Sequence, residues 1–265
     1  LSFRNLKVTN LSKRNTQQRR HTIITELNQH GEVSVDQLAK RFETSEVTIR
    51  KDLSALEKSG LLLRRYGGAI PLPQEITETK SSNLSKRKLA IAKVAAGQIK
   101  DHHRIIIDSG RTTSGLIAHV DNKPGLVVMT NSLIIANKLN ELENEPTILM
   151  TGGTWDPTSE SFQGQVAEQV LRSYDFDQLY IGADGIDIES GTTTFNELIG
   201  LSRVMAEVAR EVIVMVESEK IGRKIPNVEL TWQNINTLIT DEDLPESVKQ
   251  QIIAKGVQVI CAPLA

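Results

Sequence analysis

Three segments near the beginning of the chain place apolar residues at helical spacing. They cover residues 16–30, 35–42 and 45–58. In the third segment Ile49, Leu53 and Leu56 share one helical face, and Ser45 occupies the N-cap position before it. Gly31 follows the first segment, as a helix stop signal does. A leading helix followed by two helices across a tight turn is a helix-turn-helix pattern.

The stretch after the third helix predicts a small β-hairpin. Residues 61–71 hold two short strand-like runs around the pair Gly67-Gly68, which is a turn signal. A hairpin directly after a helix-turn-helix is a wing, and few soluble folds place these parts in this order. We therefore predict a winged helix-turn-helix DNA-binding domain over residues 17–71.

The helix after Ser45 is the predicted DNA-reading element. Its other faces carry Thr48, Arg50 and Lys51, and a hydroxyl with two cations suits a major groove lined by phosphates and base acceptors. The alternative is a capped surface helix with solvated charges, but the flanking helices and the wing favour DNA recognition. Thr48 and Arg50 are expected at base edges, and the remaining cations at phosphates. The predicted DNA-binding residues are Ser45, Thr48, Arg50, Lys51, Arg64, Arg65, Arg19 and Arg20.

The distribution of charge supports this assignment. The whole chain has a formal net charge of -2, but the two parts differ in sign. Residues 1–74 carry 13 Lys and Arg against 7 Asp and Glu, while the remainder carries 18 against 26. A basic module joined to an acidic body is typical of a protein that binds nucleic acid.

The rest of the chain alternates between apolar strands and helices. Expected strands cover residues 104–108, 126–130, 147–150, 178–182, 211–216, 237–240 and 257–261. Expected helices cover a segment from residue 85 onward and residues 112–120, 132–143, 164–174, 196–210 and 246–255. This order predicts an α/β domain over residues 85–265 with a mostly parallel sheet covered on both faces. Residues 72–84 are polar and aperiodic, as in a linker, and residues 1–16 are expected to form a flexible basic arm.

Polar turns follow five of the predicted strands. They are residues 108–113, 130–132, 151–153, 182–185 and 217–222. Ligands of open parallel sheets bind beyond the carboxyl ends of the strands. Hydroxyls, glycines and the free N–H groups of a following helix can cradle an anion there. One such turn would be ordinary capping, but five at one edge favour a pocket for a polyol phosphate.

Composition limits the remaining function classes. The chain has no run of 18 apolar residues and no apolar segment of a secretory signal near its beginning. Cys261 is the only cysteine and lies in an apolar run, so we expect a buried structural thiol rather than a nucleophile. No His or Cys cluster has metal-ligand spacing. We expect a cytoplasmic protein with no metal, no membrane span and no cofactor beyond its effector.

Motifs from both halves of the chain point to one known family. Ser45–Leu53 reads Ser-Glu-Val-Thr-Ile-Arg-Lys-Asp-Leu, Leu56–Gly60 reads Leu-Glu-Lys-Ser-Gly, and Arg65–Ala69 reads Arg-Tyr-Gly-Gly-Ala. Together they resemble the DeoR family of bacterial sugar-operon repressors, and the resemblance extends over residues 17–263. Within the family the chain is most similar to the glucitol operon repressor subgroup. That similarity lies in residues 129–133, 144–150 and 185–188.

The resemblance implies a second domain similar to ribose-5-phosphate isomerase and glucosamine-6-phosphate deaminase. These enzymes bind phosphosugars with a loop that matches Ser109–Thr113, and they use carboxylates near the positions of Asp184 and Glu197. Arg111 departs from the family pattern, where this position is most often small or polar. It could add a phosphate contact or point to solvent. The expected effector-binding residues are Asp108, Ser109, Gly110, Arg111, Thr112, Thr113, Thr130, Asn131, Ser132, Gly152, Gly153, Asp184, Glu197 and Lys220.

Two functions compete at this level. The first is a repressor, not an enzyme, whose paired subunits bind operator DNA as a homodimer or homotetramer. A phosphorylated sugar or sugar alcohol in the second domain would release it. The second is a sugar-phosphate isomerase or deaminase in which Asp184 and Glu197 transfer protons. Two observations favour the repressor: no His accompanies these carboxylates, and an enzyme would leave the winged helix unexplained.

Overall fold

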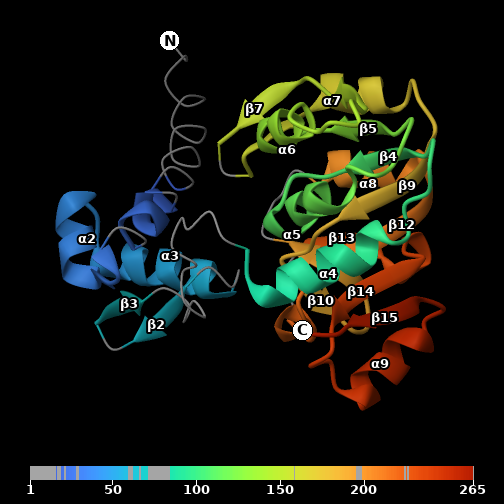
Figure 1. Cartoon of the computed structure of the whole chain (residues 1–265). Helices are drawn as coiled ribbons and strands as arrows, with labels where there is room; N and C mark the ends of the chain where they lie inside the picture. The colour runs from blue at the N-terminus through green and yellow to red at the C-terminus, as the bar shows by residue number, and fades with distance from the viewer. Residues whose placement is uncertain are drawn as a thin grey trace, which may run out of the picture. The chain divides into compact units, whose positions relative to one another are not determined.

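The computed structural model divides the chain into two compact units, Leu1–Lys80 and Ser81–Ala265. The residues it describes are 16, 19–20, 22–27, 30–58, 62–65, 67–70, 84–157, 159–194, 199–223, 225 and 227–264. The predicted arm (all but Thr16), the predicted linker (all but Leu84) and Glu197 lie outside the described residues. Figure 1 shows the elements of both units.

The first unit has the predicted helices and wing. Residues 22–27 are helical. The other elements are β1 (Val33–Ser34), α2 (Val35–Arg41), α3 (Glu46–Lys58), β2 (Leu63–Arg65) and β3 (Gly68–Ile70). The order β1-β3-β2 makes a three-stranded antiparallel sheet. The two-residue strand β1 was not predicted, because its only signal is its pairing with the distant Gly68 and Ala69.

Local chemistry explains where the two helices begin. The Ser34 hydroxyl accepts a hydrogen bond from the Gln37 N–H at 3.3 Å, and the Ser45 hydroxyl accepts one from the Thr48 N–H at 3.2 Å. Each satisfies a backbone donor that has no partner inside the helix. The predicted cap at Ser45 is therefore confirmed, and Ser34 caps α2 in the same way.

A separate apolar core holds the first unit together. Ile49, Leu53 and Leu56 are buried on the inner face of α3, as their spacing predicts. Val47 lies off that face and is 59% exposed. The core's other buried members are Ile23, Leu27, Val33, Val35, Leu38, Ala39, Leu62 and Ala69.

The second unit is built on a seven-stranded parallel sheet. Its strands are β4 (Arg104–Ile107), β5 (Val127–Thr130), β6 (Thr147–Met150), β9 (Phe176–Ile181), β12 (Ala209–Met215), β14 (Thr237–Asp241) and β15 (Gln258–Ala262). They lie in the order β15-β14-β12-β9-β4-β5-β6, and all six neighbouring pairs are parallel. The predicted parallel α/β class is confirmed.

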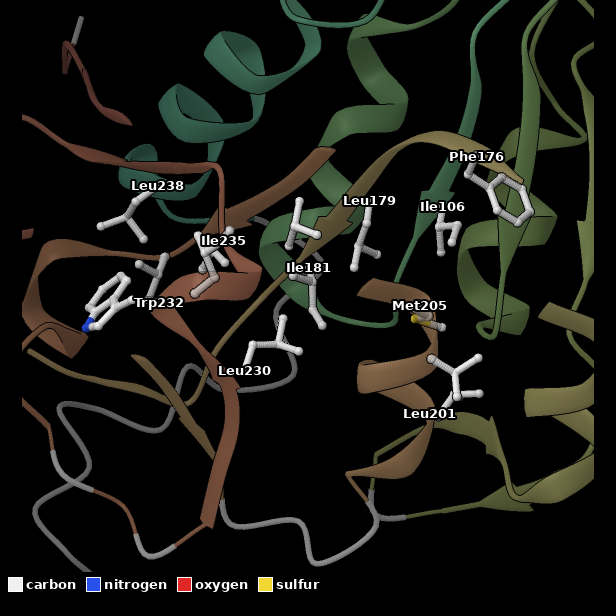
Figure 2. Packing of buried hydrophobic residues seen from close by; sticks show 14 of the residues in the cluster. Ile106, Phe176, Leu179, Ile181, Leu201, Met205, Leu230, Trp232, Ile235 and Leu238 are labelled. Atoms are coloured by element: carbon white, nitrogen blue, oxygen red, sulfur yellow. The ribbon is translucent and has the colours of Figure 1, made fainter. Parts of the chain in front are cut away.

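Helices cover both faces of this sheet. They are α4 (Lys86–Ala96), α5 (Arg111–Ser114), α6 (Leu133–Leu139), α7 (Gln165–Leu171), α8 (Gly200–Glu207) and α9 (Glu246–Ile253). Ile105 and Ile107 of β4 point into a core shared with α4 and α6. Ile106 points into the opposite core with α7 and α8, as alternation along a strand requires. Figure 2 shows Ile106 close to Leu179 and Phe176 in this second core.

Several short elements differ from the sequence prediction. The expected helix 112–120 is α5 continued as the 3-10 helix η1 (Gly115–His119), and α8 starts later and ends earlier than residues 196–210. Two antiparallel sheets were not predicted. One pairs β7 (Thr154–Asp156) with β8 (Ser161–Gln163). The other joins β10 (Gly185–Asp187), β11 (Gly191–Thr194) and β13 (Asn227–Thr231). Their sequences, such as Gly-Thr-Thr-Thr, are too short and too polar to show apolar alternation.

Candidate functional site

The solvent face of α3 carries the predicted base-reading residues. Thr48 Oγ1 lies 2.9 Å from Ser45 Oγ, so the cap and this hydroxyl form one local network. The Arg50 guanidinium pairs with Glu46 one turn earlier at 2.6 Å, and both side chains are about half exposed. Exposed pairs at this spacing contribute only about 0.3–0.5 kcal/mol. Arg50 can therefore exchange Glu46 for a base or a phosphate at little cost.

The wing is tied to the end of α3. The Arg64 N–H donates to Glu57 Oε1 at 3.0 Å, and the Arg64 guanidinium lies 3.8 Å from Glu57 Oε2. This contact holds β2 beside α3 and leaves the Arg64 side chain exposed. The side chain of Arg65 lies outside the described residues.

The structure changes the interpretation of Arg19 and Arg20. We expected phosphate contacts, but Arg19 Nε lies 2.6 Å from Asp52 Oδ2 and Arg20 Nε lies 2.8 Å from Asp52 Oδ1. Asp52 is 2% exposed. Burial of a carboxylate is costly unless cations and hydrogen bonds compensate, and the two guanidinium groups do so. Both arginines therefore fasten the leading helix to α3.

The strand order defines a crevice in the second unit. From β4 the chain proceeds to β5 and β6 on one side, and then returns to β9 on the other. At such a switch point the connections on either side diverge, and in open parallel sheets a ligand crevice is expected there, beyond the carboxyl ends of the two central strands. Asp108 directly follows β4, and Asp184 comes three residues after β9. The predicted first and fourth turns therefore flank this crevice.

A buried hydrogen-bond network joins the first two turns. Asn131 Nδ2 donates to Asp108 Oδ1 at 2.7 Å, while Asn131 Oδ1 accepts from the Ser109 N–H at 2.8 Å. The Thr113 hydroxyl donates to the Asp108 carbonyl at 2.8 Å. Asn131 and Thr113 are fully buried, so this network fixes the loop between β4 and α5. Thr112 is buried beside it, whereas Gly110 and Arg111 are exposed.

Other predicted residues have local structural tasks. The Ser132 hydroxyl caps α6 by accepting from the Ile135 N–H at 3.4 Å, and Thr130 Oγ1 accepts from the Ser132 N–H at 3.2 Å. Gly152 and Gly153 have φ values of +60° and +108°, which L side chains rarely adopt. A Cβ on Gly153 would lie 2.5 Å from the Gln163 carbonyl oxygen. These glycines therefore form the turn into the β7–β8 hairpin.

Lys220 belongs to the turn after β12, but its side chain reaches the turn after β9, residues 182–185. Its ammonium donates to the Ala183 carbonyl at 3.2 Å, next to Asp184. The Thr194 hydroxyl donates to Asp184 Oδ2 at 2.7 Å. Burial lowers the pKa of Lys220, and the negative charge of Asp184 opposes that shift. The structure thus brings Asp184 and Lys220 together, as expected.

Glu229 is a residue of this site that the sequence did not indicate. Its carboxylate accepts from the Ser202 hydroxyl at 2.6 Å and from the Thr192 hydroxyl at 3.5 Å. Thr192 and Thr194 lie two apart on β11, so the hydroxyls that hold Glu229 and Asp184 share one face. Sequence analysis missed Glu229 because it lies within β13, a strand that had no recognisable pattern.

The carboxyl groups of Asp108, Asp184 and Glu229 lie close enough together for the charge of one to shift the pKa of another. The pKa of Glu229 is raised to about 7, first by burial and then by the negative charges of Asp108 and Asp184. The pKa of Asp108 is raised to about 6, again mainly by burial and in smaller part by Asp184. Both shifts mean that burial disfavours the charged form of these two carboxyl groups. Hydroxyl groups and cations of a ligand would be favourable partners there.

A second hollow lies at the opposite edge of the sheet. It has a volume of about 570 Å³, and Arg104, Arg172 and Arg210 line it. Arg172 pairs with Glu207 at 2.5 Å, and Arg210 approaches Asp177 at 3.5 Å. Because these pairs neutralise two of the three arginines, and the hollow lies at the amino ends of the strands, it is a poorer candidate for the ligand site.

The two units together define a class of protein. A winged helix-turn-helix with an exposed recognition helix binds DNA, and the switch point of an open parallel sheet is where domains of this architecture take up small molecules. None of the helices in the described ranges is long and apolar enough to span a membrane. Among the same residues, no group of three or more His, Cys, Asp and Glu is placed to hold a metal ion. The class is therefore a DNA-binding regulator with a separate ligand-sensing domain.

Family models identify both domains. The DeoR C terminal sensor domain matches residues 84–242, and the DeoR-like helix-turn-helix domain matches residues 19–75. The chain belongs to the DeoR family. It is 39% identical over 252 residues to an aga operon transcriptional repressor of Escherichia coli O157:H7, covering 92% of this chain and 93% of that one. It is 32% identical to the HTH-type transcriptional regulator GlpR of Haloferax volcanii, covering 86% and 90%.

These relatives decide between the two functions considered from the sequence. They are transcriptional regulators, so the chain is a DNA-binding regulator and not an enzyme. The glucitol subgroup assignment stays a prediction, because the relative at 39% identity is named for the aga operon.

Solved structures match the chain only loosely. A ribose 5-phosphate isomerase from Methanocaldococcus jannaschii has a TM-score of 0.38 and 18% identity, covering 51% of this chain and 53% of that one. A probable sor operon regulator from Shigella flexneri has a TM-score of 0.44 and 11% identity, covering 64% and 89%. Neither likeness bears on the site.

Proposed function

We propose that this chain represses a sugar or sugar-alcohol operon and leaves its operator when a phosphorylated sugar or sugar alcohol occupies the switch-point crevice. The observation that carries the proposal is the convergence of Asp108, Asp184, Glu229 and Lys220 at the carboxyl ends of β4, β9 and β12. Carboxylates suit sugar hydroxyls, and a lysine suits a phosphate. The aga operon relative agrees with a role in carbohydrate metabolism.

Each part of the ligand has a matching part of the crevice. In this proposal the phosphate lies against the loop Ser109–Thr113 and receives charge from Lys220, with Arg111 as a further contact. Hydroxyls donate to Asp108, Asp184 and Glu229, and Glu197 remains an expected contact that lies outside the described residues. The fixed network around Asn131 supports this division, because preorganised polar groups lose little freedom when a ligand binds.

On DNA, α3 enters the major groove. Thr48 and Arg50 contact base edges, while Lys51, Arg64 and Arg65 neutralise phosphates. Two copies reading paired half-sites would explain how so small a reader achieves specificity, so we propose a homodimer or homotetramer. Its place of action is the cytoplasm, at the nucleoid.

A panel of ligands tests the sensor. Phosphorylated hexitols, hexoses and amino sugars are screened for a rise in the melting temperature of the full chain, since a ligand of the native state stabilises it. We expect at least one compound to raise the temperature, and Asp184→Asn to abolish the rise. Asp177→Asn, the same change at the opposite edge of the sheet, should keep it. If no compound stabilises the protein, or if Asp184→Asn responds fully, the proposed site is wrong.

A further inference from the structure

The first turn of α4 is where the chain enters the sensor domain from the DNA-reading unit. Ser85 caps α4, because its hydroxyl accepts from the Lys88 N–H at 3.2 Å. The same hydroxyl donates to Glu217 Oε1 at 2.8 Å. The residues between the two units precede this turn in the chain.

Glu217 is a buried carboxylate held by this turn. Lys88 Nζ lies 3.4 Å from Glu217 Oε2, and both side chains are less than a tenth exposed. Separating such a pair would leave a buried charge without compensation, which is strongly unfavourable. Glu217 and the first turn of α4 are therefore expected to move together.

The loop that begins at Glu217 also reaches the crevice. The Lys220 N–H donates to the Glu217 carbonyl at 2.9 Å, which closes a single tight turn, η2 (Ser218–Lys220). The Lys220 ammonium then donates to the Ala183 carbonyl, beside Asp184. Only two residues, Ser218 and Glu219, thus separate a group held by α4 from a group proposed to hold the ligand.

A second set of contacts, partly exposed to solvent, holds the turn Ser218–Lys220 against α4 and the end of β14. Arg87 lies 3.2 Å from Glu219 and 2.6 Å from Asp243. Ser218 donates to both oxygens of Asp241, through its N–H at 2.8 Å and its hydroxyl at 2.6 Å. The loop therefore has a defined position relative to α4.

The phosphate side of the crevice also meets α4. Gly115, at the start of η1, packs so closely that a Cβ there would lie 2.9 Å from Ala92 Cβ and 3.1 Å from Leu84 Cδ1. Gly115 comes directly after α5, which follows the loop Ser109–Gly110. The loop Ser109–Thr113 is thus connected to α4 through Gly115, and the turn Ser218–Lys220 through Glu217.

From these contacts we infer that Glu217 is a positioning residue through which occupation of the crevice is passed to the first turn of α4 and on to the residues that lead to the DNA-reading unit. The inference rests on the proposed function. A phosphate that draws Lys220 from the Ala183 carbonyl moves the turn Ser218–Lys220. Glu217 follows that turn and carries Ser85 and Lys88 with it. A ligand with different affinity for the two arrangements then shifts their populations.

Hydrogen–deuterium exchange of the full chain tests this coupling. The probes are inorganic phosphate, glucose 6-phosphate, glucosamine 6-phosphate and glucitol 6-phosphate. Peptides covering residues 105–116 report on the crevice, and peptides covering residues 84–92 report on the first turn of α4. In the unmodified chain we expect an effective probe to change exchange several-fold in both peptides. In Glu217→Gln only the crevice peptide should respond.

Each outcome decides a different question. A response of residues 84–92 in Glu217→Gln equal to that of the unmodified chain overturns the inference and leaves the proposed function intact. So does a crevice response without any change at residues 84–92 in the unmodified chain. If no probe changes residues 105–116, the proposed sensor function is itself overturned, and the inference falls with it.

Two further variants keep the test interpretable. Glu207→Gln makes the same chemical change in an exposed pair with Arg172 at the far edge of the sheet, and both peptides should respond as in the unmodified chain. If Glu217→Gln does not fold, the double variant Lys88→Met, Glu217→Gln removes both buried charges together and tends to preserve stability. It should show the same loss of response at residues 84–92.

Discussion

Arg50 and Lys51 are neighbours on α3, but we expect them to contribute differently to DNA binding. Arg50→Ala should cost roughly 1–3 kcal/mol on the operator and relax its specificity, because a guanidinium can bond two acceptors of one base. Lys51→Ala should weaken binding to all sequences alike. It should also reduce, by about 1, the magnitude of the slope of the logarithm of the binding constant against the logarithm of the salt concentration. Salt titrations on operator and random DNA measure both effects. Equal losses on the two DNAs for Arg50→Ala would exclude base reading.

Asp52 illustrates how a buried charge can have a purely structural task. Asp52→Ala should lower the stability of the first unit by about 3–5 kcal/mol, because it leaves Arg19 and Arg20 without their carboxylate. Glu46→Ala, which removes an exposed partner of Arg50, should cost only about 0.5 kcal/mol. Thermal unfolding of the full chain followed by circular dichroism compares them. Similar losses in the two variants would argue against the buried tie.

Glu229 should make the stability of the second unit depend on pH. Its pKa of about 7 in the folded chain exceeds its ordinary value of 4.5, so the folded state holds the proton more tightly. Stability from this group is complete below the ordinary value and is lost as pH rises through 7. The melting temperature should therefore fall by several degrees between about pH 5 and pH 8.

The matching variant removes this titration. Glu229→Gln is neutral throughout the range, so its melting temperature should fall less than that of the unmodified chain, by a margin attributable to Glu229. Glu207→Gln, at an exposed carboxylate, should leave the pH dependence as it is. An identical pH profile for Glu229→Gln would show that this carboxyl is not held in its neutral form by burial.

At the scale of elements, the folding of the wing depends more on Gly68 than on Gly67. A Cβ on Gly68 would lie 2.1 Å from the Val33 carbonyl oxygen, so Gly68→Ala must separate β1 from β3. We expect a loss of about 2 kcal/mol or more and weakened DNA binding. Gly67→Ala meets no atom within 4 Å and bears only the strain of its φ of +79°, about 1–2 kcal/mol. If Gly67→Ala proves the more harmful, contact between β1 and β3 is not the limiting feature.

The elements also show what a sequence can and cannot predict. Strands such as Arg104–Ile107 and helices such as Glu46–Lys58 were found because their own apolar periodicity marks them. The closeness of Asp108, Asp184 and Lys220 was expected because polar turns after parallel strands meet at one edge. By contrast, β1 and β11 exist through pairing with distant segments.

Partners distant in sequence also explain two features of the sites that no local pattern indicates. Glu229 was missed because Thr192, Ser202 and the neighbouring carboxylates that define its environment come from other elements. Arg19 and Arg20 were assigned to phosphates because nothing local reveals Asp52, more than thirty residues away, as their partner. A pattern within one segment does not contain such pairings.

At the scale of the whole molecule, we expect the sensor to work without the DNA-reading unit. Among the described residues, the cores of the second unit contain none from the first, so residues 81–265 should fold alone. The ligand that stabilises the full chain should raise the melting temperature of this fragment by a similar amount. Calorimetry of the fragment with and without that ligand measures this. A fragment that folds but does not bind would show that the site needs the first unit.

Separate cores also have an evolutionary consequence. Because no described core residue of one unit belongs to the other unit's core, recombination near residue 80 could exchange one unit and leave the other correctly folded. Such an exchange would place a different set of genes under the same metabolite. The small contact set around Ser85 and Glu217 would then be the part of the sensor domain that a new combination has to accommodate.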